Sequence, residues 1–182
     1  MRIPSYLLRA RERWQQARRP EGIVTPAPGQ ESVWDYPRPP RLEPTARHLA
    51  VDFGGERIAD TRRGLRLLET SHPPTYYFPR EDVEMRYLVP SERRSICEWK
   101  GEAEYFSVAV GRHLASNAVW SYPNPFPEYQ SLAGYLAFMP AAMDACWVDG
   151  ERARPQAGGF YGGWITSDLA GPIKGAPGSE GW

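Results

Sequence analysis

The sequence has little that would assign it at once to a known chemical class. It contains no Cys-x-x-Cys pair, only the isolated cysteines Cys97 and Cys146, and three histidines, so it does not supply the ligands of a four-coordinate structural zinc site. Lys plus Arg and Asp plus Glu each total 22, so the basic surplus of a nucleic-acid-binding protein is missing. We therefore expect no metal, no other cofactor and no nucleic-acid partner.

Two further absences concern membranes and export. No apolar run approaches the ~18 residues that a membrane-spanning helix needs, and the first residues, MRIPSYLLR, lack the apolar stretch of a secretory signal. We expect a cytoplasmic protein with reduced cysteines, although a single Cys97–Cys146 disulfide stays open as an alternative.

Proline and aromatic residues, by contrast, are abundant. The 182 residues include 19 prolines, together with seven tryptophans and ten tyrosines, and this proline content is about twice the usual ~5%. Proline interrupts helices, aromatic residues are typical of strands and packed cores, and disordered chains contain few aromatics. The composition therefore predicts one mainly β domain, built from short strands and turns, with additional segments at its ends.

The first of these segments is basic. Residues 1–19 contain six arginines, with Leu7, Ala10 and Trp14 on one helical face, which predicts an amphipathic basic helix. We expect it to dock on its own domain or on a partner subunit, with binding to a membrane surface or an anionic polymer as the alternative.

Two irregular segments flank the β domain, which we place at residues 46–154. Residues 20–45 contain seven prolines and predict an arm without regular structure. Residues 155–182 are rich in glycine but keep aromatic anchors such as Trp164, so we expect this tail to pack on the body of the protein. A homodimer formed through the helix or the tail is a further expectation.

A strand expected at residues 64–70 carries the first candidate site residue, Glu69. Side chains alternate along a strand, so Leu65, Leu67 and Glu69 share one face. A carboxylate at the edge of a core must be paired or hydrogen-bonded. Glu69 is therefore either a structural residue, in an ion pair or a strand-end hydrogen bond, or a general base or ligand-orienting acceptor.

The next candidates are Cys97 and Lys100, around a turn between strands expected at residues 95–99 and 103–110. Lys100 is interpreted either as a solvated turn residue or partner of Glu69, or as the anchor of an anionic ligand group. Along a continuous strand Cys97 and Lys100 point to opposite faces, which argues against a reactive pair unless the following glycine introduces a bulge. Cys97 is then most simply a small buried hydrophobic residue.

Four aromatic residues complete the candidate site. Tyr105 lies on the strand face opposite the apolar Phe106 and Val108, so it does not share their core layer. With the remaining members of the set it either packs in the core and loops or lines a pocket. The set comprises Tyr77, Tyr105, Trp120 and Tyr122.

Four ordered motifs give the chain a family resemblance. They are Glu69-Thr-x-His-Pro-Pro-x-Tyr-Tyr-x-Pro-x-Glu-Asp-Val, Cys97-x-x-Lys-Gly-x-Ala-x-Tyr, Ala118-x-Trp-x-Tyr-x-x-Pro and Gly134-Tyr-x-Ala-Phe. On these motifs, residues 46–152 resemble the bacterial family called domain of unknown function 427 (DUF427), sometimes labelled a nucleotidyltransferase domain.

The resemblance implies a compact antiparallel fold of the β-tent (Mss-four-like) type. Proteins of that topology include zinc-stapled modules, methionine sulfoxide reductases of the B type and aromatic-cage ligand binders. This chain departs from the zinc-bearing relatives because it lacks both Cys-x-x-Cys pairs, and it has no Asp-x-Asp metal pair of the polymerase-like transferases. A shared fold does not by itself transfer a function.

Three hypotheses about function follow. The first is a small-molecule-binding domain in which Tyr77, Tyr105, Trp120 and Tyr122, with Cys97 nearby, surround a ligand whose polar ends Glu69 and Lys100 fix. The second is an enzyme, for nucleotidyl or other group transfer, in which Glu69 is the general acid/base and Lys100 stabilises an anion. The third is a protein-interaction or oligomerisation module.

Overall fold

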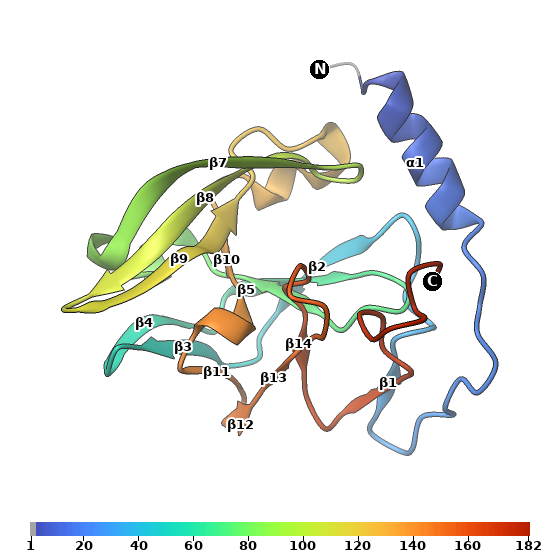
Figure 1. Ribbon diagram of the computed structural model, residues 1–182. Helices are drawn as coiled ribbons and strands as arrows, with labels where there is room; N and C mark the ends of the chain where they lie inside the picture. The colour runs from blue at the N-terminus through green and yellow to red at the C-terminus, as the bar shows by residue number, and fades with distance from the viewer. Residues whose placement is uncertain (1–2) are drawn as a thin grey trace.

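The computed structural model describes residues 3–182 and confirms a mainly β protein with an N-terminal helix (Figure 1). The helix α1 (Ser5–Gln15) lies along one side of the β domain. Within the described residues, no helix is both long and apolar enough to cross a bilayer.

Two four-stranded antiparallel sheets form most of the body. One has the order β12-β11-β3-β4 and the other β10-β9-β8-β7. Their strands are β3 (Leu49–Phe53), β4 (Glu56–Thr61), β7 (Leu88–Cys97), β8 (Gly101–Val110), β9 (His113–Ser121), β10 (Leu136–Phe138), β11 (Ala145–Val148) and β12 (Glu151–Arg152).

A third sheet has three strands in the order β2-β5-β6, namely β2 (Arg41–Thr45), β5 (Gly64–Leu68) and β6 (Thr75–Tyr77). Immediately after β6, Phe78 pairs with Leu136 of β10, which connects this sheet to the second four-stranded one. The remaining elements are the parallel pair β1 (Glu31–Ser32) and β15 (Leu169–Ala170), the pair β13 (Arg154–Pro155) and β14 (Trp164–Ile165), and short 3-10 helices η1 (Arg80–Asp82), η2 (Met85–Tyr87), η3 (Pro127–Leu132) and η4 (Pro140–Ala142).

The two faces of β8 pack in different apolar clusters. Phe106 and Val108 belong to the main core, with residues of β3, β4, β9, β10 and β11. Ala103 and Tyr105 belong to a second cluster, with residues of β5 and β9. The predicted alternation along this strand is therefore confirmed, and it turns the Tyr105 side of the sheet toward β5 rather than toward the main core.

The predicted irregular arm contains regular structure at its end, so that expectation is wrong. Arg41–Thr45 pairs antiparallel with the whole of β5, even though Pro44 stands opposite Leu65. Proline is tolerated there because β2 is the outer strand of its sheet, where one side makes no ladder hydrogen bonds. Earlier in the arm, Trp34 and Tyr36 are buried against the body.

Two predicted strand ends are also corrected. The strand carrying Glu69 ends at Leu68, so Glu69 lies just beyond it. The strand expected at residues 95–99 is longer at its start and ends at Cys97, which pairs directly with Gly101. The three residues between them form the hairpin turn, and Gly101, with φ of +100°, adopts a conformation that other residues rarely reach.

The C-terminal tail packs on the body. Trp164 of β14 is fully buried in the main core, and its indole nitrogen donates a hydrogen bond to the Phe138 carbonyl at 3.3 Å. A Cβ added to Gly162 would lie 2.1 Å from a ring carbon of Trp120, so only glycine lets the tail approach this ring so closely.

Helix α1 is docked on the protein's own β domain. The Arg11 guanidinium donates hydrogen bonds to the carbonyls of Glu98 at 2.6 Å and Trp99 at 3.1 Å, within the β7–β8 turn. It also lies 5.4 Å from the ring centroid of Trp99. The helix therefore supports the turn that carries Lys100.

Candidate functional site

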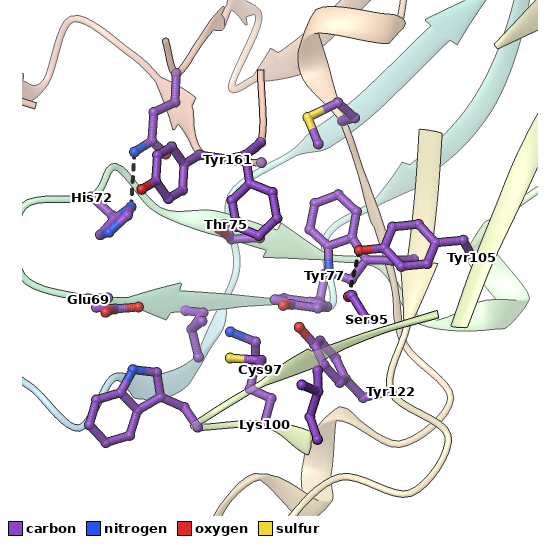
Figure 2. Close-up of a pocket in the computed structure, with 18 of the residues that line it drawn as sticks. Glu69, His72, Thr75, Tyr77, Ser95, Cys97, Lys100, Tyr105, Tyr122 and Tyr161 are labelled. Atoms are coloured by element: carbon purple, nitrogen blue, oxygen red, sulfur yellow. Dashed lines mark hydrogen bonds between the residues drawn. The ribbon is translucent and has the colours of Figure 1, made fainter. Parts of the chain in front are cut away.

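A cavity of about 390 Å³ lies between the β5–β6 hairpin, strands β7 to β9 and the tail (Figure 2). All of the predicted site residues contribute to its lining: Glu69, Tyr77, Cys97, Lys100, Tyr105, Trp120 and Tyr122. Figure 2 shows Glu69 and His72 toward one side and Tyr105 toward the other, with Cys97, Lys100 and Tyr122 beneath Tyr77. Residues from separate motifs therefore meet around one space.

Cys97 and Lys100 both line this cavity, which corrects the expectation that they point to opposite faces. That expectation assumed a continuous strand, whereas the chain turns after Cys97. Lys100 is not a solvated turn residue, because only 7% of its surface is exposed. Its ammonium lies 5.5 Å from the centroid of the Tyr122 ring.

The titratable groups around Lys100 are coupled through their charges. Burial opposes the charged form of Lys100, but the neighbouring side chains of Cys97, Tyr122, Tyr77 and Glu69 favour it more strongly and raise its pKa well above the usual value. Burial likewise raises the pKa of Tyr122 well above its usual value and raises that of Tyr77. At neutral pH this part of the cavity therefore contains an ammonium and two uncharged phenols.

Glu69 forms its ion pair with Arg38 and not with Lys100. Arg38 Nε donates to Glu69 Oε1 at 3.1 Å, and the side chains are only 6% and 19% exposed. Arg38 also donates to the carbonyl of Thr70 at 2.9 Å. Residues 3–182 contain no group of three or more potential metal ligands, so Glu69 belongs to no such group.

The aromatic residues that line the cavity are fixed by contacts with their neighbours. Tyr77 and Trp120 meet edge to face, with ring centroids 6.5 Å apart and planes at 84°. The Tyr105 hydroxyl is held by Ser95 Oγ at 2.8 Å, and the Arg93 guanidinium lies 4.6 Å from the Tyr105 ring centroid. Tyr105 is thus fixed in orientation by polar contacts from the neighbouring strand β7.

Sequence reasoning missed the part of the cavity that contains His72. The Gln156 side-chain amide donates to His72 Nδ1 at 2.9 Å, and the Tyr161 ring meets the imidazole with centroids 5.0 Å apart. Burial lowers the pKa of His72 to about 4, so its imidazole is neutral at pH 7. The His-Pro-Pro motif could have identified His72 as a site residue, but nothing local indicated its partners in the tail.

A second buried lysine, Lys174, was also missed. It is 3% exposed and lines the same cavity. Its ammonium donates to the Trp182 carbonyl at 2.6 Å and to the Glu180 carbonyl at 3.4 Å, and it lies 3.9 Å from the Trp14 ring centroid. Burial and the nearby Arg38 charge lower the pKa of Lys174 to about 8.

Comparison with known proteins supports the resemblance found in the motifs. A family profile described as Domain of unknown function (DUF427) matches residues 41–149, so the match includes β2, which we had placed in the arm. A search of curated proteins finds no match. Because the matched segment covers more than half of the 182 residues, this chain belongs to the DUF427 family.

Proposed function

We propose that this protein binds a small molecule in the cavity that Tyr77 helps to line. The observation that carries the proposal is the cavity itself: about 390 Å³, with walls supplied by Tyr77, Tyr105, Trp120 and Tyr122. Ligand sites are typically concave spaces of ~300–1,000 Å³, largely apolar or aromatic, with a few polar groups that fix the orientation of the ligand. This space fits that description in size and in lining.

The arrangement of the rings supports a ligand with a planar or apolar part. Tyr77 and Trp120 are perpendicular to each other, so a flat group that stacks on one ring meets the edge of the other. Trp120 is backed by the tail at Gly162. The rings are thus held by the fold before any ligand arrives, which reduces the entropy lost on binding.

The alternative of an acid–base enzyme draws less support from these contacts. A general acid/base needs a carboxylate that is available to exchange a proton with the substrate. Glu69 instead accepts a hydrogen bond from the buried Arg38 guanidinium at 3.1 Å, which occupies one of its oxygens. Glu69 in this arrangement is suited to orienting Arg38.

The test is a ligand search with matched tryptophan variants. The protein would be purified without denaturation and examined by native mass spectrometry for bound small molecules, and candidate compounds would be added in thermal-shift assays. We expect a ligand of the wild type to be lost in Trp120→Ala and retained in Trp147→Ala. Trp147 is a suitable control because it is hydrogen-bonded to Asp52 on another sheet and does not line the cavity.

Each ligand-induced shift is compared with the ligand-free melting temperature of the same variant, because removing a large core ring destabilises a protein by about 3–5 kcal/mol. Equal shifts in Trp120→Ala and wild type would contradict the proposed site. Equal loss in both alanine variants would show that the effect is one of general stability and would also count against it.

A further inference from the structure

The Lys100 ammonium has no partner of opposite charge. Within the described part of the chain, residues 3–182, it makes no hydrogen bond and no ion pair, although more than nine-tenths of the residue surface is buried. An ammonium has three hydrogens to donate, and burying it without acceptors is costly. The nearest compensating contact is the Tyr122 ring, at 5.5 Å from its centroid.

The carboxylates of the cavity do not supply the missing acceptor. Glu69 and Glu98 are the acidic residues of the lining, and neither forms an ion pair with Lys100 in residues 3–182. The Glu69 carboxylate is held by Arg38 at 3.1 Å. An oxyanion at Lys100 would therefore have to come from outside the protein.

The groups beside Lys100 are donors as well. Burial raises the pKa of both Tyr77 and Tyr122, so their hydroxyls are protonated at neutral pH. The Tyr122 hydroxyl has no hydrogen-bond partner among the residues that the structure describes. Lys100 and this hydroxyl together provide hydrogen-bond donors at one place, without a negatively charged acceptor beside them. Such an arrangement binds a carboxylate or phosphate oxygen.

Resting on the function proposed above, we propose that the ligand is a small planar molecule with a carboxylate or phosphate group, whose oxygens bind the Lys100 ammonium and the Tyr122 hydroxyl. The planar part lies against the perpendicular rings of Tyr77 and Trp120. Lys100 suits such a group because its ammonium is a compact point charge with rotatable donors.

The test compares anions with neutral compounds of the same shape. Binding of benzoate and phenyl phosphate to the full chain at pH 7 would be measured by calorimetry or ligand-observed NMR, beside benzamide and benzyl alcohol. We expect at least one of the two anions to bind at least tenfold more tightly than benzamide. The benzoate and phenyl phosphate arms distinguish a carboxylate from a phosphate as the preferred group.

Variants then locate the preference. Lys100→Met is expected to weaken binding of the preferred anion at least tenfold and to change benzamide binding less than threefold. Tyr122→Phe, which keeps the ring, is expected to weaken the anion about threefold. Lys174→Met is the matched control: it removes another buried ammonium of the same cavity, but one that already has carbonyl acceptors, and the preference for anions should persist.

The outcomes separate this inference from the proposed function. Equal binding of benzoate, phenyl phosphate and benzamide to the wild type would overturn the inference and leave the binding function standing. A preference that survives Lys100→Met in a folded variant, or that Lys174→Met abolishes, would also overturn it. Binding of none of the four compounds would overturn the inference, whereas the proposed function stands or falls with the ligand search and the tryptophan variants.

Discussion

Lys100 and Lys174 line the same cavity and are buried to similar extents, with 7% and 3% of their surfaces exposed, yet their ammonium groups are held differently. Lys174 donates to two backbone carbonyls and lies over the Trp14 ring. In residues 3–182, Lys100 has no such acceptor. One lysine therefore joins the tail and helix α1 to the body, while the other presents its charge to the cavity.

The difference extends to the neighbours of each lysine. The Lys174 region also contains Arg38, Glu69, Trp14 and His72. It is connected by hydrogen bonds, by cations that lie over the Trp14 ring and by the edge-to-face contact of His72 with Tyr161. The Lys100 region consists of Lys100, Cys97, Tyr77 and Tyr122. Buried polar groups that are fully paired specify structure, whereas one left unpaired lowers stability and is retained where it serves a function.

The largest expected effect comes from breaking the Lys174 region at Arg38. Arg38→Ala removes hydrogen bonds to Glu69, Trp14 and Thr70 and leaves a largely buried carboxylate, 19% exposed, without its partner. Losing one member of a buried ion pair typically destabilises a protein by about 3–5 kcal/mol. We expect a loss of this size in urea unfolding at pH 7.

The double variant Arg38→Ala/Glu69→Gln is the control for that measurement. Removing the charge of Glu69 as well should restore part of the stability lost in Arg38→Ala, because the carboxylate is then no longer buried unpaired. If Arg38→Ala destabilises by less than 1 kcal/mol, the Lys174 region is not the connected structural unit described here.

The second effect is the pH dependence due to His72. Burial lowers the pKa of His72 from 6.5 to about 4, so as pH falls the unfolded chain takes up a proton before the folded one does. The stability that neutral His72 contributes is complete above pH 6.5 and is lost progressively between pH 6.5 and 4. From pH 7 to pH 5 we expect a loss of about 2 kcal/mol.

His72→Gln should remove that dependence, because glutamine can still meet the Gln156 amide but does not titrate. The check is urea unfolding at pH 7, 6 and 5 for both proteins. Carboxylates with lowered pKa values, such as Asp82, whose pKa is lowered by hydrogen bonds from Thr61 and Arg63, titrate below this window and should leave the difference between the two proteins unaffected. Parallel stability curves would refute the buried neutral imidazole.

The Lys100 region was more predictable from sequence than the Lys174 region for a physical reason. Strand periodicity predicted the side of β8 on which Tyr105 stands, and in the structure that side packs in a cluster with residues of β5. The prediction that Cys97 and Lys100 point to opposite faces was wrong, because the sequence does not show whether the residues before a glycine continue a strand or form a turn. Once the strand ends at Cys97, both side chains reach the same cavity.

The Lys174 region depends on contacts between segments without periodicity. Arg38 comes from the proline-rich arm, and Gln156 and Lys174 come from the glycine-rich tail. In such segments the path of the chain is set by glycine, proline and long-range packing rather than by a repeating pattern, so no local signal places these side chains. A match of the arm to β5 was missed for the same reason, because prolines around Arg41–Thr45 obscured the edge strand.

The third effect distinguishes the two lysines by their response to alkaline pH. Burial and Arg38 lower the pKa of Lys174 to about 8, so above pH 8 the folded protein releases a proton that the unfolded chain still holds. Stability attributable to Lys174 should therefore rise by about 1 kcal/mol from pH 7 to pH 9. The measurement is the difference in unfolding free energy between wild type and Lys174→Met at both pH values.

Lys100→Met is the matched comparison in that experiment. Because the pKa of Lys100 is raised, its folded and unfolded forms are both protonated throughout this range, and its difference from wild type should not change. A rise of equal size for both lysine variants would show that the effect is not specific to Lys174.

The smallest expected effect concerns the stability of Lys100→Met without ligand. Replacing a buried charge by an apolar side chain of similar length is often neutral or stabilising, and here no hydrogen bond or ion pair among residues 3–182 is lost with the ammonium. We expect the unfolding free energy at pH 7 to stay within about 0.5 kcal/mol of wild type or to rise by up to about 1 kcal/mol. A structural lysine behaves in the opposite way, because its removal leaves acceptors unpaired. A loss above about 2 kcal/mol would therefore break the comparison of the two lysines, whereas an unchanged or more stable variant means that the fold does not require the charge it buries at Lys100.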